Sequence, residues 1–147
     1  MILDKYQLSA DSSLMVFEFD SIGPKGKVTK VVQYSETNLK DVYNLGFGDK
    51  DPNTGEIDDF NVTNNGDSMT VLATVAATVY AFTDKHPNAM IYARGADKAR
   101  LRLYRMGINN YFAQISQDFQ VYGMLDGMWL HFKKGVNYEA FLVKRKK

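Results

Sequence analysis

The chain has 147 residues, of which 45% are hydrophobic and 24% charged, and its formal net charge is +1 at pH 7. This length and composition fit one globular domain with a substantial core, and they exclude a chain that is disordered throughout. The absence of cysteine excludes disulfides, thiolate metal sites and a cysteine nucleophile. No stretch approaches the ~20 apolar residues of a membrane span, and no secretory signal is visible. We therefore expect one cytoplasmic domain over residues 1–147.

The first part of the chain predicts a β-hairpin followed by a short helix. Residues 14–22 alternate in the manner of a strand, GPKG at 23–26 is a turn sequence, and residues 27–34 alternate again. Residues 39–45 carry apolar side chains at helical spacing and end at a pair of glycines, so we expect a short helix there.

A long, uncharged helix is expected over residues 68–83. The segment is apolar almost all round, which predicts a helix buried on most sides. The sequence NNGDS at 64–68 offers short polar side chains that cap free backbone N–H groups, and a His-Pro pair at 86–87 ends the helix.

The second half predicts a strand, a second long helix and a final set of strands. The expected elements are a strand at 89–94, a helix from Asp97 to about Ser116 with a kink at Gly107, a hairpin at 119–133 that turns at Asp126-Gly127, and a strand at 138–143. The predicted fold class is α+β, with a mixed, mostly antiparallel sheet of about six strands packed on two long helices plus one short helix.

Basic residues cluster where the strand at 89–94 leads into the second long helix. The candidate anion- or nucleic-acid-binding residues are Arg94, Lys98, Arg100, Arg102 and Arg105. Basic side chains around a strand-to-helix turn can gather phosphates, and the free N–H groups of a helix N-terminus assist them. The alternative is a solvated helix face opposite an apolar core stripe.

Two further features bear on this prediction. The tail at 144–147 is basic and would add to the first cluster if the two lie together. The last hairpin carries Tyr122, Met124, Trp129 and His131 at alternate positions, which is typical of an aromatic surface that stacks on single-stranded bases. The alternative is that half or more of these side chains belong to the core.

An acidic segment at 49–67 precedes the long uncharged helix, and it includes a predicted short strand at 57–62. Its opening resembles a calcium loop, but Gly55 is one place late and Phe60 stands where a bidentate Glu is required. A solvated turn is favoured over a hard-cation site of another kind. The remaining sequence shows no zinc spacing and no nucleophile motif. We therefore predict no catalytic residue, no metal and no cofactor.

Several segments together resemble a known family. They are VYNLGFGD at 42–49, GEIDD at 55–59, TNNGD at 63–67, residues 71–83, LRLYRMGI at 101–108 and YEAFLVKRK at 138–146. The chain is similar over nearly its whole length to a family of short proteins, found mainly in Bacteroidetes, that is catalogued as a domain of unknown function. The resemblance implies a single-domain, bacterial, cytosolic protein and carries over no catalytic residue.

Three functional hypotheses follow. The first is a module that binds nucleic acid or a phosphorylated ligand through the basic strand-to-helix segment. The alternative is a protein-interaction or scaffold domain, in which the acidic segment of one subunit of a homodimer meets the basic helix of the other. The third, favoured least, is a metal-assisted hydrolase that uses Asp49, Asp58 and Asp59. None of the three involves a membrane.

Overall fold

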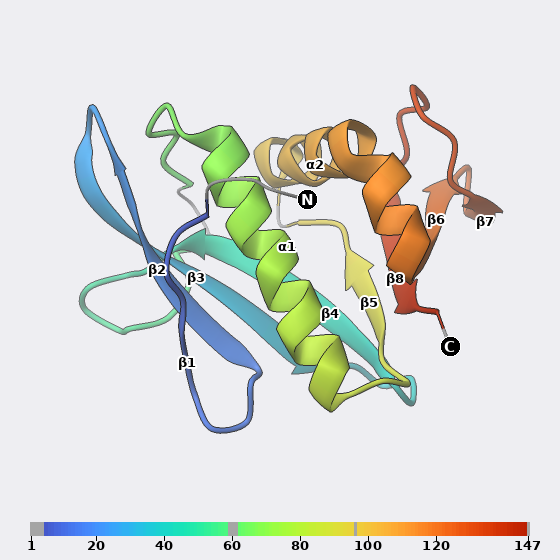
Figure 1. The fold of residues 1–147 in the computed structure, drawn as a ribbon, viewed down its shortest axis with the longest axis horizontal. Helices are drawn as coiled ribbons and strands as arrows, with labels where there is room; N and C mark the ends of the chain where they lie inside the picture. The colour runs from blue at the N-terminus through green and yellow to red at the C-terminus, as the bar shows by residue number, and fades with distance from the viewer. Residues whose placement is uncertain (1–4, 59–61, 96, 147) are drawn as a thin grey trace.

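The computed structural model describes residues 5–58, 62–95 and 97–146. Within these ranges it contains two helices and one sheet of eight strands in the order β1-β2-β3-β4-β5-β8-β6-β7. Both helices lie on the same side of the sheet (Figure 1). The elements are β1 (Ser9–Ala10), β2 (Val16–Gly23), β3 (Gly26–Glu36), β4 (Val42–Asp49), α1 (Ser68–Lys85), β5 (Met90–Ala93), α2 (Lys98–Asp118), β6 (Phe119–Leu125), β7 (Met128–His131) and β8 (Ala140–Arg145).

The predicted α+β class with a mixed, mostly antiparallel sheet is confirmed. Only β4 and β5 pair in parallel, and the other neighbouring strands pair antiparallel. The estimate of about six strands is wrong, because β1 and β4 were not expected. The predicted strand at 57–62 is reduced to an isolated bridge between Ile57 and Lys50, and residues 59–61 lie outside the described ranges.

The short helix predicted at 39–45 is wrong, because the chain there enters strand β4. In β4 the side chains of Leu45 and Phe47 point into the core and are buried. A Cβ added to Gly46 would lie 3.3 Å from the Ile57 Cδ1 atom, so the glycine leaves room for the following loop. Pairing with β3 along one edge and β5 along part of the other satisfies the β4 backbone, and this outweighs the local helical spacing.

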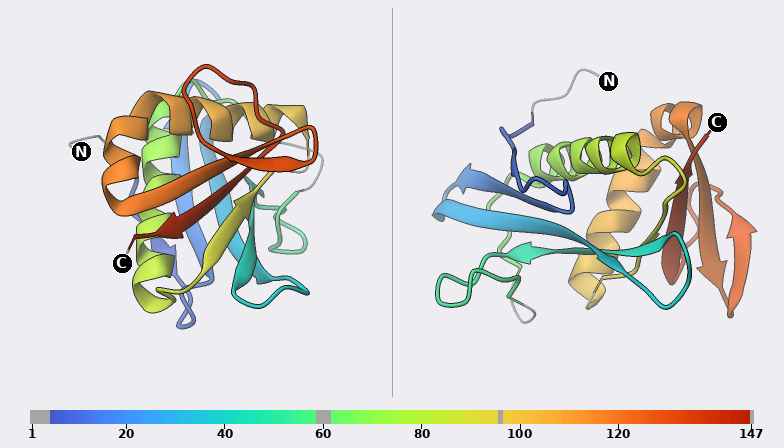
Figure 2. Two further views of the ribbon diagram at one scale, coloured as in Figure 1. Left: turned by 90° about the vertical axis from the view of Figure 1, so that its right-hand side faces the viewer. Right: turned by 90° about the horizontal axis from the view of Figure 1, so that it is seen from below.

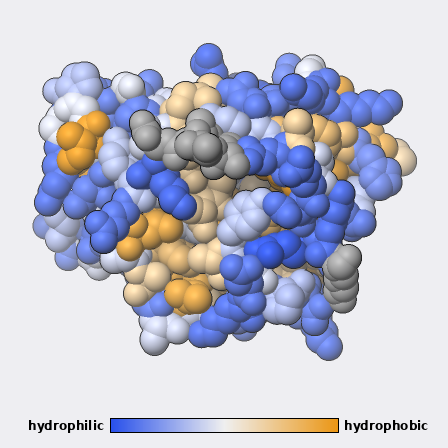
Figure 3. Space-filling view, viewed as in Figure 1, coloured by the Kyte–Doolittle hydropathy of each residue, from blue (hydrophilic) through white to orange (hydrophobic). Residues whose placement is uncertain are grey.

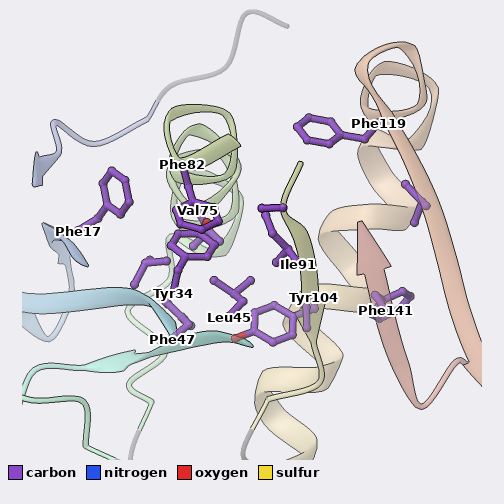
Figure 4. Close-up of a cluster of buried hydrophobic side chains, with 14 of the residues drawn as sticks. Phe17, Tyr34, Leu45, Phe47, Val75, Phe82, Ile91, Tyr104, Phe119 and Phe141 are labelled. Atoms are coloured by element: carbon purple, nitrogen blue, oxygen red, sulfur yellow. The ribbon is translucent and has the colours of Figure 1, made fainter. Parts of the chain in front are cut away.

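Helix α1 forms where the sequence predicted it and packs its apolar side on the sheet. Val75 and Phe82 lie over the strands in the core cluster (Figure 4). The Thr78 hydroxyl is buried between the Tyr34 hydroxyl and the Val75 carbonyl, 2.8 and 2.7 Å away. A threonine can therefore occupy the apolar face, because its one polar atom is hydrogen-bonded within the core.

The start of α1 is held in a different way from the one the sequence suggested. Asp67 is the N-cap residue, but its side chain makes no capping bond to the described first turn. Its Oδ2 atom instead accepts hydrogen bonds from the Tyr6 hydroxyl at 2.6 Å and the Ser21 hydroxyl at 2.5 Å. Asp67 thus joins the N-terminal segment and β2 to the helix.

On this side of the molecule, apolar residues follow α1 across the surface (Figure 3).

Helix α2 also matches its prediction in position, and Asp97 caps it by accepting a hydrogen bond from the Arg100 backbone N–H at 2.9 Å. The expected kink at Gly107 is wrong. The helical dihedral angles break at Tyr111, with φ −119° and ψ 17°. Gly107 has another role, since a Cβ there would lie 3.1 Å from the Leu72 Cδ2 atom, and the glycine therefore lets Leu72 of α1 pack closely against α2.

The final strands complete one end of the sheet. The hairpin of β6 and β7 turns at Asp126 and Gly127 with φ values of 53° and 76°, as the type I′ prediction requires. Strand β8 then inserts between β5 and β6. The Tyr138 ring covers Gly123 of β6, where a Cβ would lie 2.3 Å from the Tyr138 Cγ atom. This close approach explains why a glycine stands in the middle of a buried strand.

Candidate functional site

Arg100 is a structural residue in this fold, with only 1% of its surface exposed. Strand β5 pairs with β4 only along Val42–Asn44, so the two strands separate before Phe47. The Arg100 side chain enters this gap. Its Nε atom donates to the Phe47 carbonyl at 2.6 Å, Nη1 to the Asp97 carboxylate at 2.7 Å and Nη2 to the Asp58 carbonyl at 2.7 Å. The guanidinium therefore satisfies backbone groups where strand pairing has stopped.

The other members of the basic segment do not form one cluster. Arg105 is half-buried, and its Nη2 atom donates to the Tyr138 carbonyl at 3.1 Å. Lys98 and Arg102 are exposed, one helical turn apart on α2. Arg102 lines a pocket of about 390 Å³ beside the start of α1. Arg94 is exposed on the other side of the first turn of α2 and lines a second pocket of about 280 Å³.

An uncovered sheet face lies next to Arg94. Alternate residues of a strand face opposite sides, so the residues between the core positions of β5, β8, β6 and β7 point away from the helices. In the part of the chain that the structure describes, no helix lies over this side (Figure 2, left). We call it the open face. Its residues are Met90, Tyr92, Gln120, Tyr122, Met124, Trp129, His131, Leu142 and Lys144.

The aromatic side chains of the open face form two pairs. The rings of Tyr92 and Trp129 meet edge to face, with centroids 6.0 Å apart and planes at 82°. Those of Tyr122 and His131 lie 5.1 Å apart at 38°. Trp129 belongs to β7 and Tyr92 to β5, so this contact reaches across the two strands between them. The predicted aromatic surface on the last hairpin is therefore confirmed as a surface, and β5 extends it.

Two residues of the predicted basic tail, Lys144 and Arg145, belong to strand β8. Lys144 lies on the open face, whereas Arg145 points to the helix side, where its Nη2 atom donates to the Thr83 hydroxyl and the Asp84 carboxylate, both at 2.8 Å. Lys144 pairs with Met90 at the start of β5, and Arg94 directly follows the end of that strand. At about 3.3 Å per residue these two positions are roughly 13 Å apart. The sequence left open whether the tail and the basic helix meet, and in the fold Lys144 and Arg94 lie at opposite ends of the open face.

The acidic segment is folded onto its own chain. The Asp49 carboxylate is largely buried and accepts hydrogen bonds from the Lys30 ammonium at 2.5 Å and from the Thr63 hydroxyl at 2.5 Å. The Asp58 carbonyl receives Arg100. Across the described residues, no three His, Cys, Asp or Glu side chains are placed to hold a metal ion. Asp59, the third carboxylate of the hydrolase hypothesis, lies outside those residues.

Sequence reasoning missed Tyr92 and Lys144 as neighbours of the hairpin aromatics. Tyr92 alternates with the buried residues Ile91 and Ala93, which is a signal for an outward side chain. The sequence does not indicate that β8 lies between β5 and β6. This position of β8 makes the surface continuous.

The fold and the site define an α+β domain with one helix-covered sheet face and one open, aromatic sheet face. The chain belongs to the family of unknown function DUF6934, whose family model matches residues 3–146. No curated protein and no solved structure matches it. The match confirms the predicted membership of a family of unknown function, while a bacterial source and a cytoplasmic location stay predictions. Neither of the two described helices is long and apolar enough to cross a membrane.

Proposed function

We propose that the protein binds nucleic acid, with Arg94 and Lys144 as phosphate contacts at the two ends of the open face. The observation that carries the proposal is the charge of this face. Among the residues of the open face Lys144 is a cation and none is acidic, and Arg94 directly follows the end of β5, although the chain as a whole is nearly neutral. A local surface of this kind attracts a polyanion even when the net charge does not.

The contacts proposed for Arg94 and Lys144 are electrostatic. Lys98 and Arg102 are also exposed, but they belong to α2 on the helix-covered side of the sheet and form a separate pair of cations. Each phosphate that is neutralised releases counterions, and affinity then falls steeply with salt. Arg100 takes no part in this contact, because its guanidinium is held inside the fold.

The pocket beside Arg94 gives one phosphate a defined place. Besides Arg94 its lining includes Asn44, Tyr92, Gly95 and the buried Arg100, and it measures about 280 Å³. An arginine at the rim of such a hollow can donate two parallel hydrogen bonds to one phosphate group. We therefore expect Arg94 to contribute more to affinity than Lys144, which binds as a point charge on a flexible stem.

Fluorescence anisotropy with labelled 12-nucleotide probes tests the proposal. The full chain should bind at micromolar concentration in 50 mM salt and lose most of this affinity at 200 mM. Arg94→Gln should weaken binding to all sequences. It should also lower the slope of log affinity against log salt concentration by about the amount that one phosphate contact contributes. Lys25→Gln, in the distant turn between β2 and β3, is the matched control and should bind as the unmodified chain does. The absence of any salt-sensitive binding would refute the proposal.

A protein-interaction role is the second candidate, and strand β7 favours it. This strand ends the sheet, and its residues Met128 and Leu130 are 64% and 41% exposed on the side opposite Trp129. An exposed apolar edge strand can pair with a strand of another chain. Light scattering over a hundredfold range of protein concentration tests this role, and a constant monomer mass would exclude the homodimer.

A further inference from the structure

We infer that the nucleic acid bound is single-stranded, and that Tyr92, Tyr122, Trp129 and His131 stack on its bases. This inference rests on the nucleic-acid binding proposed above. It adds a mode of base contact and a choice between single and double strands, neither of which follows from the cations at Arg94 and Lys144.

The first argument is the placement of the rings. All four are carried by paired strands, so the sheet fixes their spacing and little conformational freedom is lost when a ligand binds. Trp129 is 39% exposed, and neither Tyr92 nor Tyr122 is fully buried, so each ring keeps surface available on the side away from the core. Every base offers a π-face, and stacking on aromatic side chains is how many proteins hold bases without reading their sequence.

The second argument is the way in which bases can reach the rings. Rings carried on a sheet face can contact the planes of bases only when those bases are unstacked and turned outward, and bases inside a duplex are not. The phosphates of a duplex could still meet Arg94 or Lys144, but its bases could not reach the rings between them. The surface therefore favours a single strand that lies across β5, β8, β6 and β7.

The third argument is the charge of the open face, which distinguishes a nucleic acid from other ligands that could cover aromatic side chains. The outward positions carry Lys144 and are flanked by Arg94, with no acidic side chain among them. A second copy of the chain, docked by this same face, would bring cations toward cations. A polyanion with flat apolar groups fits both the charge and the rings, and a single-stranded nucleic acid has this chemistry.

Trp129 provides a direct test because it is the only tryptophan in the chain. Unlabelled single-stranded DNA or RNA of 12 nucleotides should quench its fluorescence in 50 mM salt. The duplex of the same sequence should bind more weakly and leave the emission nearly unchanged. Inorganic polyphosphate, which has phosphates but no bases, should compete for the cations without quenching Trp129.

Variants of the partner rings complete the experiment. Tyr92→Ala and Tyr122→Ala should each weaken single-strand binding at least about fivefold, the lower end of the effect of removing one stacking ring. Tyr122→Phe keeps the ring and should recover most of the affinity that Tyr122→Ala loses. Ile22→Ala, an exposed apolar residue on distant β2, is the control for loss of apolar surface. Circular dichroism checks that each variant is folded.

The results distinguish this inference from the function on which it rests. If Arg94→Gln weakens binding but duplex binds as well as single strand and the ring variants bind normally, the stacking inference is wrong and the nucleic-acid function stands. If no oligonucleotide binds at all, both are wrong. A mass that rises with protein concentration, together with no oligonucleotide binding, would favour the homodimer and overturn the inference.

Discussion

The two faces of β5, β8, β6 and β7 differ although they are built from alternating residues of the same strands. Toward the helices, Ile91, Val121 and Phe141 are buried in the core. The next residue along each strand, Tyr92, Tyr122 and Leu142, points outward and keeps part of its surface exposed. One face thus contributes to stability by burial, and the other remains available for a ligand. A sheet can perform both tasks because its side-chain period is two.

Arg94 and Arg100 show the same contrast for a charged side chain. Arg94 is exposed at the end of β5, whereas Arg100 is buried and hydrogen-bonded in the gap between β4 and β5. Both belong to one basic stretch of sequence. Their roles differ because Arg94 follows the end of β5 and stays outside the gap, whereas Arg100 lies in the first turn of α2 and its side chain enters the gap.

Removing the buried arginine should give the largest effect. Arg100→Ala would leave the Phe47 and Asp58 carbonyls and the Asp97 carboxylate without this partner, so we expect the free energy of unfolding to fall by about 3–5 kcal/mol. Urea titration followed by circular dichroism measures the change. Arg94→Ala is the matched variant and should lie within about 0.5 kcal/mol of the unmodified chain. Equal losses in both variants would remove the distinction between the two arginines.

Adding one methyl group to the inner face should give a smaller effect. Gly123→Ala places a Cβ 2.3 Å from the Tyr138 ring, so the ring or β8 must move. We expect a loss of about 1–3 kcal/mol in the free energy of unfolding, the usual range for overpacking. Val136→Ala, in the loop before Tyr138, is a control that removes apolar volume from the core without adding a Cβ under the ring. An unchanged stability in Gly123→Ala would show that the close packing is not needed.

The smallest effect should appear at alkaline pH on the helix side. Burial, with the Asp118 carboxylate that accepts its hydroxyl hydrogen bond, raises the pKa of Tyr80 to about 12 from its ordinary value of 10.0. The folded state therefore holds this proton more tightly than the unfolded state. The resulting stability is complete below pH 10 and is lost as pH rises from about 10 to about 12.

Tyr80→Phe should make the fall in stability between pH 10 and pH 12 less steep. It should not abolish the fall, because burial also raises the pKa of Tyr34 and Tyr104. Urea midpoints at a series of pH values measure the slope. An identical slope in both proteins would mean that Tyr80 does not titrate differently in the folded and unfolded states.

Local patterns were sufficient for most elements but not for β4. The hairpins and both long helices were predicted because their signals lie within a few residues, such as Asp126-Gly127 for the last turn. Strand β4 was missed because Leu39, Val42 and Tyr43 also fit a helix, and only pairing with β3 and β5 decides between the two. The kink at Tyr111 likewise carries no local signal comparable to that of a glycine.

The candidate site was predicted in part. Alternation on the last hairpin placed Tyr122, Met124, Trp129 and His131 on one side, and the register confirms this. Exposure of Lys98 and Arg102 agrees with a basic helix face. The burial of Arg100 could not be read from the sequence, because its partners Phe47 and Asp58 are distant along the chain and belong to segments with no fixed position until the sheet forms.

The sequence by itself determined the α+β class, the long helix at α1 and the side of each strand on which a residue falls, because helical and strand periods are local properties of the chain. Tertiary structure decided which of these sides meet. The position of β8 between β5 and β6 places Tyr92 on the same surface as the aromatic residues of the last hairpin. The separation of β5 from β4 leaves a gap in which the Arg100 side chain is buried. Strand order depends on contacts between distant segments, and those contacts form only when the whole core packs together.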